Sequence, residues 1–214
     1  MSSKSDNFID ALVGDLRPVR AMRARDGLAL AALAGGTTIS LTVAMLGLRP
    51  DVAAGNFSAL FLFANGLLLA VAIGCTMAAV RMGMPRVGQS SHGWKWVVAI
   101  AGLLPIAAVI MLASRTEAMP ETLARGHELK CVAMGLCLGL LTAATLIVWL
   151  RRGAPTSIGR AGLMVGLASG SVGMLAFSLH CPIDSFYHVG LWHSLPILLG
   201  GLLGRIAIPR LIRW

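Results

Sequence analysis

The chain has 214 residues, 57% of them hydrophobic and only 13% charged, with a mean hydropathy of +0.79. Soluble domains carry about a quarter charged residues, so this composition excludes an ordinary soluble protein. The net charge is +9, but the basic residues lie in short segments between apolar stretches. No basic patch is interleaved with aromatic residues, so direct nucleic-acid binding is not expected.

A short amphipathic helix is predicted in the segment 1–27, which precedes the first apolar stretch. The apolar residues of this segment fall on one helical stripe: Phe8, Ile9, Leu12, Val13 and Leu16. Pro18 ends the helix. The opposite face carries Asp10 and Asp15, whereas surface helices that bind lipid usually have a basic polar face. The stripe is therefore predicted to bind a protein partner rather than the bilayer surface.

Six apolar stretches follow, each close to the roughly 20 residues that a helix needs to cross a bilayer core of about 30 Å. They are 28–48, 57–80, 96–113, 131–150, 161–179 and 189–204. Each stretch is continuous, and lipid cannot satisfy exposed backbone N–H and C=O groups, so each is predicted to be a helix. The expected fold is all-α: a polytopic membrane protein with a six-helix transmembrane domain, 28–208, and a short tail, 209–214.

The basic residues predict the orientation of these spans. Of the 18 Lys and Arg residues, all but four fall on one side of the predicted membrane. This side holds the N-terminal segment, the loops after the second and fourth spans, and the C-terminus. The four on the other side are Arg49, Arg115, Arg125 and Lys130. Because cytoplasmic loops carry the excess of positive charge, both termini are predicted to be cytoplasmic.

Glycines spaced four residues apart predict how the spans pack. Such pairs and triplets occur on three spans: Gly135 and Gly139, then Gly162, Gly166 and Gly170, then Gly200 and Gly204. Small residues at this spacing let two helix backbones approach closely in lipid. The spans also contain almost no ionisable groups, since apart from cysteines they carry only His193. Asn65 is uncharged and fits an interhelical hydrogen bond.

Two of the four cysteines are predicted to lie at similar depth near the outer face. Cys131 opens the fourth span and Cys181 follows the fifth, so both belong to the side opposite the termini. Cys75 and Cys137 lie inside spans and are predicted to be small buried hydrophobic residues.

Three interpretations of the outer cysteines are open. Cys131 and Cys181 could form a redox-switchable pair, since an oxidising compartment permits disulfides. They could bind a metal ion together with nearby side chains: His127, His180, His188 or Glu128. They could also form a static structural disulfide or remain unpaired thiols.

Two sequence elements accompany the six spans. The N-terminal element reads Phe-Ile-Asp-Ala-Leu-Val-Gly-Asp-Leu-Arg-Pro-Val at residues 8–19. The second is His-Cys-Pro-Ile-Asp-Ser at residues 180–185, with Trp192 and His193 behind it. Together with an outer-facing Cys131, these features resemble the NrsF-type membrane anti-sigma factors of proteobacteria. These are negative regulators of extracytoplasmic-function sigma factors, and the similarity covers essentially the whole chain.

The resemblance implies that the N-terminal stripe captures such a sigma factor and holds it at the bacterial inner membrane. It also implies that two outer cysteines take part in sensing, and these map onto Cys131 and Cys181. The family is associated with oxidative and heavy-metal stress, which fits both the redox and the metal interpretation. The expected partners are then a sigma factor and the lipid bilayer. No cofactor is expected beyond a transient metal ion at the cysteines.

Two other function classes remain open. A membrane thiol oxidoreductase usually has a CxxC pair, whereas Cys131 and Cys181 are far apart in sequence. A small-solute transporter usually needs charged groups inside the membrane, which the spans lack. The chain carries no nucleotide-binding loop, nucleophile elbow or HExxH motif, and it is predicted not to be an enzyme.

Overall fold

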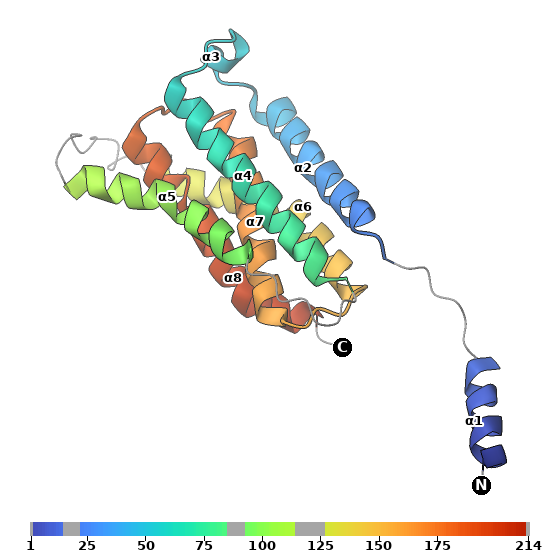
Figure 1. Ribbon diagram of the computed structural model, residues 1–214. Coiled ribbons are helices and arrows are strands. Elements are labelled where there is room, and N and C mark those ends of the chain that lie inside the picture. Colours follow the sequence, from blue (N-terminus) through green and yellow to red (C-terminus); the bar gives the residue numbers. More distant parts are fainter. Residues whose placement is uncertain (1, 15–21, 85–92, 114–126, 213–214) are drawn as a thin grey trace.

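The computed structural model of the chain describes residues 2–14, 22–84, 93–113 and 127–212 (Figure 1). Every regular element in these ranges is a helix, which confirms the all-α prediction. The α-helices are α1 (Ser2–Gly14), α2 (Ala24–Leu46), α3 (Pro50–Ala53), α4 (Ala59–Met82), α5 (Gly93–Ala113), α6 (His127–Arg151), α7 (Ile158–Ser178) and α8 (Leu195–Ile212). A π-helix, η2 (His188–Trp192), precedes α8.

Five helical segments are long and apolar enough to cross a membrane. They are Ala24–Leu46, Ala59–Met82, Glu128–Arg151, Ile158–Ser178 and His188–Ile212. The remaining expected span, 96–113, coincides with α5, which runs obliquely to α4 in Figure 1. α5 has 21 residues, but it is not among the five segments identified as long and apolar enough to cross a membrane within the described part of the chain, so the sixth span stays a prediction.

The last helix extends further than its sequence pattern predicts. The expected span 189–204 is followed in the structure by two more helical turns, and α8 ends at Ile212 within the expected tail 209–214. Ile208 and Ile212 are both buried on one face of α8. Burial of these two side chains favours the longer helix, although Pro209 lacks one backbone donor.

α7 is the central helix of the bundle, and it packs against α2, α4, α6 and α8. Its contact with α8 is made through glycines: a methyl group added to Gly166 would overlap the Gly200 carbonyl oxygen. Gly162 faces the Gly204 carbonyl in the same way. The contact of α7 with α6 is equally close. A methyl group added to Gly173 would overlap the Gly135 carbonyl oxygen, and one added to Gly139 would overlap the Ser169 carbonyl oxygen. The predicted close packing through these glycines is confirmed.

At the opposite end from Cys131, α6 is joined to its neighbours through Trp149. The Trp149 indole Nε1 donates a hydrogen bond of 3.1 Å to the Val80 carbonyl of α4. Gly27 at the start of α2 and Gly83 after α4 both lie against the indole ring, which leaves no room for a side chain at Gly27. Trp149 therefore links the end of α6 to the start of α2 and the end of α4.

Polar and sulfur-containing side chains inside the spans divide into buried and exposed groups. The Ser178 hydroxyl of α7 donates a hydrogen bond to the Asn65 side-chain oxygen of α4, so the interhelical bond expected for Asn65 is confirmed. Cys75 is fully buried, as predicted. The prediction of burial is wrong for Cys137, which is exposed on the outside of the bundle. Its helix α6 turns this position away from α7, since Gly135 and Gly139 fill the contact instead.

The connections between helices collect at two ends, as the predicted topology requires. The Arg49 N–H, after α2, donates to the Leu179 carbonyl after α7 at 2.9 Å. Nearby, Nδ1 of His180 lies 3.3 Å from the Gly47 carbonyl oxygen. The α2–α4 and α7–η2 connections therefore meet at the end of the bundle where α6 begins. The N-terminal helix α1 is a separate element joined to α2 through residues 15–21, which lie outside the described ranges.

Candidate functional site

A buried arginine organises the end of the bundle at which α6 begins. Arg49 donates from Nε to the Asp51 carboxylate at 2.6 Å, and this hydrogen bond lowers the pKa of Asp51. Its guanidinium lies 5.2 Å from the centre of the Phe61 ring, a cation–π arrangement. It also lies 4.0 Å from Asp184 in the α7–η2 connection. Arg49 thus ties the two connections together and compensates its own burial with charge and aromatic contacts.

Four side chains that can bind a metal or undergo redox chemistry meet near this arginine. We call them the Cys–His cluster: Cys131, Cys181, His188 and His193. One donor atom from each of the four lies within 4.8 Å of the others, and all four residues are buried. Nε2 of His188 lies 3.5 Å from the Cys131 sulfur and 3.6 Å from the Cys181 sulfur. All four cysteines of the chain are free thiols in the structure.

Three elements carry the cluster. Cys131 lies in the second turn of α6, and Cys181 follows α7, where its N–H donates to the Phe177 carbonyl at 3.1 Å. His188 begins η2 and His193 directly follows it. Any chemical change at the cluster therefore acts on the ends of α6, α7 and α8 together.

The π-helix explains why two histidines five residues apart share one site. In an α-helix such residues differ by about 140° around the axis. In η2 the wider turn, with its i→i+5 hydrogen bonding, brings residue i+5 back towards residue i. The rings of His188 and His193 accordingly lie edge to face with centroids 5.1 Å apart. The Ser185 hydroxyl accepts the His188 N–H at 3.2 Å and fixes where this segment begins.

The surroundings of the cluster favour the ionised form of Cys181. The Cys131 thiol and His188 hydrogen-bond to Cys181, and these contacts hold the pKa of the Cys181 thiol below its usual value although burial opposes the shift. Thiolate is the form of cysteine that binds metals and attacks oxidants. Glu128, one helical turn before Cys131, is buried as well.

The structure brings some of the predicted site residues together and separates others. Cys131, Cys181 and His188 lie within one cluster. His180 lies apart from it, with its ring tilted against Phe177 at a centroid distance of 5.8 Å. His127 begins α6, but its side chain lies outside the described part of the structure.

Sequence reasoning did not select His193 as a site residue, although it is a full member of the cluster. α-Helical periodicity places it on a different face from His188. The contact between the two histidines depends on the π-helix, which the sequence pattern does not indicate. The one available signal was that His193 is the only ionisable residue besides cysteine in the predicted spans.

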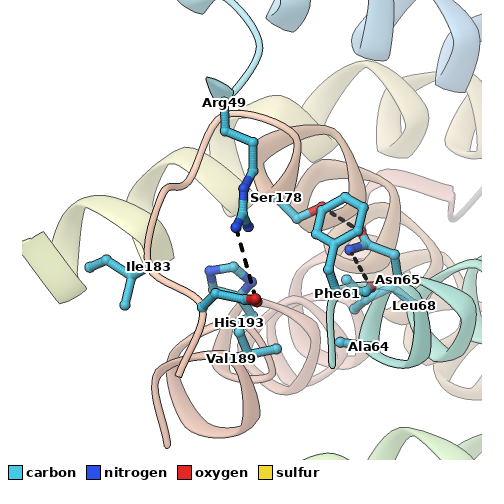
Figure 2. A pocket seen from close by; sticks show the side chains of 10 residues that line it. Arg49, Phe61, Ala64, Asn65, Leu68, Ser178, Ile183, Val189 and His193 are labelled. Carbon is cyan, nitrogen blue, oxygen red and sulfur yellow. Dashed lines mark hydrogen bonds and ion pairs between the residues drawn. The ribbon is translucent and has the colours of Figure 1, made fainter. Parts of the chain in front are cut away.

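Figure 2 shows a small pocket beside the cluster, lined by Arg49, Phe61 and the His193 ring among others. These side chains line a cavity of about 10 Å³, close to the minimum for one water molecule. Asn65 and Ser178 close its far side through their hydrogen bond. His193 thus lies between a polar cavity on one side and the two cysteines on the other.

Comparison with known proteins decides the family. A family model described as "Negative regulator of sigma F" matches residues 12–214. The chain belongs to the NrsF family. "Anti-sigma-F factor NrsF" of Caulobacter vibrioides is 31% identical over 99% of this chain and all of its own length. "Probable anti-sigma-F factor NrsF" of Azospira oryzae is 26% identical over the same share of this chain. No solved structure matches the chain.

The N-terminal helix gives this NrsF-family chain a second candidate site. Phe8, Ile9, Leu12 and Val13 lie on α1, and each is more than half exposed. The fifth residue of the predicted stripe, Leu16, lies outside the described residues. Four large apolar side chains on one exposed helix form a surface typical of partner binding.

Proposed function

We propose that the chain is an anti-sigma factor that holds an extracytoplasmic-function sigma factor at the bacterial inner membrane. In this proposal α1 captures the sigma factor, and a redox or heavy-metal signal at Cys131 and Cys181 releases it. Family membership supports the anti-sigma role. The single observation that carries the capture step is the exposed apolar stripe of α1, where Phe8 is 65% and Leu12 55% exposed.

The stripe suits the helix-in-groove mode of recognition, in which an amphipathic helix lays its apolar face into a groove of its partner. A helix of 13 residues is marginal when isolated in water. Burial of its apolar face against a sigma factor would stabilise the helix and occlude the surface that it covers. The acidic opposite face disfavours the bilayer as the alternative partner.

The distribution of basic residues supports the topology that this proposal needs. The end of the bundle with Trp149 also carries Arg81 and Arg151, whereas Arg49 is the basic residue held at the other end by Asp51. With the more basic end in the cytoplasm, α1 faces the sigma factor and the Cys–His cluster faces the periplasm.

A continuous set of contacts supports communication between the two ends. Cys131 and Trp149 lie on the same helix, α6, about 27 Å apart along its axis. Trp149 contacts Gly27 at the start of α2, the helix that follows the α1 segment. Displacement of α6 at the cluster therefore moves the surface on which α2 begins. To change the ratio of sigma-factor-bound to sigma-factor-free chain from 99:1 to 1:99, the signal must shift the free-energy difference between these two states by about 5.5 kcal/mol.

Capture is tested by purification of the tagged full chain from membranes that contain candidate extracytoplasmic-function sigma factors. We expect one sigma factor to copurify, with identification by mass spectrometry. Deletion of residues 2–14 should abolish its retention while the membrane domain still accumulates. Undiminished retention by the shortened chain would show that α1 is not the capturing element.

Sensing is tested by the release of that sigma factor when oxidant or Cd²⁺ is added. Cys131→Ser and Cys181→Ser should each retain the sigma factor but fail to release it, because each removes one reactive sulfur. Cys137→Ser is the matched control, since this cysteine is exposed on the outside of α6 and should release normally. Release from both cluster variants at the rate of the unmodified chain would contradict sensing at these thiols.

A further inference from the structure

The dimensions of the Cys–His cluster match those of a four-coordinate metal site. Zn–S bonds of about 2.3 Å and Zn–N bonds of about 2.0–2.1 Å, at tetrahedral angles, place neighbouring sulfur and nitrogen ligands about 3.5 Å apart. The two sulfur–nitrogen distances at His188 are 3.5 and 3.6 Å. All four donors lie within 4.8 Å of one another, so small shifts complete the tetrahedron.

Hydrogen bonding alone satisfies this arrangement poorly. One imidazole nitrogen offers either one lone pair or one proton, yet Nε2 of His188 lies almost equally close to two sulfurs. The second histidine supplies an independent observation: Nε2 of His193 is buried and has no hydrogen-bond partner in the described part of the chain. A buried polar atom without a partner costs about 1–3 kcal/mol of folding stability. A metal ion bound to the His193 ring would remove this cost.

The donor set defines the class of ion. Two thiolates and two imidazoles are soft and intermediate ligands, which favour Zn²⁺ and related ions over Mg²⁺ or Ca²⁺. Two thiolates also neutralise a divalent cation, which matters because Cys131 is 4% and Cys181 2% exposed. Arg49 adds no uncompensated charge nearby, since Asp51 and Asp184 balance it.

We propose that Cys131, Cys181, His188 and His193 form a tetrahedral Cys₂His₂ site for a soft divalent cation of the zinc type. The ion joins the start of α6, the α7–η2 connection and the start of α8. His193 is a direct ligand, which distinguishes this site from a simple pair of reactive thiols. Only the link between metal occupancy and partner release rests on the proposed function.

The test uses the purified full chain in detergent, loaded separately with Zn²⁺ and with Co²⁺. We expect one equivalent of Zn²⁺ per chain by elemental analysis. With Co²⁺ we expect the visible absorption of a tetrahedral site together with sulfur-to-metal charge transfer. His193→Gln and His188→Gln should each weaken binding by at least about tenfold, because loss of an outer-sphere partner alone costs 10–100-fold. His180→Gln and Cys137→Ser are the matched controls and should bind as the unmodified chain does.

A second measurement needs no substitution and covers the case in which a histidine variant does not fold. Zn²⁺ should protect Cys131 and Cys181 of the unmodified chain from alkylation, with Cys137 reacting at the same rate throughout. Binding below one equivalent, no protection, or folded histidine variants with unchanged affinity would each overturn the proposed site. Sigma-factor retention measured on the same preparation separates the outcomes: retention without metal binding overturns the metal site alone, and metal binding without retention overturns the proposed function alone.

Discussion

Substitution of Leu12 by aspartate is expected to abolish retention of the sigma factor by the full chain. Leu12 lies at the centre of the α1 stripe, with Phe8 and Ile9 on either side. A carboxylate there would be buried in an apolar groove without a partner, which is strongly unfavourable. Loss of a central interface anchor typically costs about 2–4 kcal/mol, so we expect a decrease in affinity of roughly 30- to 1000-fold, measured by quantitative pull-down.

Asn7→Asp is the matched control for this substitution. It also adds one negative charge to α1, but on the face opposite Leu12. Because that face does not enter the groove, affinity should change by less than about twofold. Equal losses from the two substitutions would indicate that net charge rather than the apolar stripe governs binding, and would contradict the helix-in-groove interpretation.

Gly166→Ala is expected to destabilise the bundle strongly. The added methyl group would overlap the Gly200 carbonyl oxygen, and backbone cannot rotate away as a side chain can. Overpacking of a well-filled core typically costs about 1–3 kcal/mol, and this position belongs at the upper end because α7 and α8 must separate. Thermal unfolding in detergent measures the effect.

Gly66→Ala is the matched control, because a methyl group at this helical position of α4 meets no atom within 4 Å. Alanine in a helix interior is favoured over glycine by about 0.5–1 kcal/mol, so this variant should be slightly more stable than the unmodified chain. Similar unfolding temperatures for Gly166→Ala and Gly66→Ala would show that the α7–α8 contact is looser than the structure indicates.

The sequence was sufficient to predict the helices and their close contacts, because these depend on continuous apolar stretches and on glycine spacing. Continuous apolar stretches predict helices because lipid offers no backbone hydrogen bonds, and five of the expected stretches are helices long and apolar enough to cross a membrane. Glycine spacing predicted which faces approach, and the Gly166–Gly200 contact confirms it. α5 was harder to assign, since length and apolarity do not specify how an oblique helix sits against its neighbours.

The candidate site depended on local geometry that periodicity does not report. Topology alone indicated that Cys131 and Cys181 share one side of the membrane. The membership of His193 depends on the π-turn of η2, in which one extra residue per turn changes the face of every residue that follows. Likewise, the exposure of Cys137 follows from which face of α6 the glycines bring against α7, and not from its apolar neighbours.

The burial of α7 has a consequence for how the protein is made. Its mean hydropathy of 1.5 is the lowest among the five segments that are long and apolar enough to cross a membrane, and 83% of its most apolar 18-residue stretch is buried inside the bundle. We expect a segment of this kind to gain little from lipid contact, so that its insertion depends on the helices around it. α8, the partner that closes over its glycines, is synthesised after it. Until α8 has been made, the glycine face of α7 has no partner helix to cover it, so we expect truncation before α8 to lower the yield of the whole bundle.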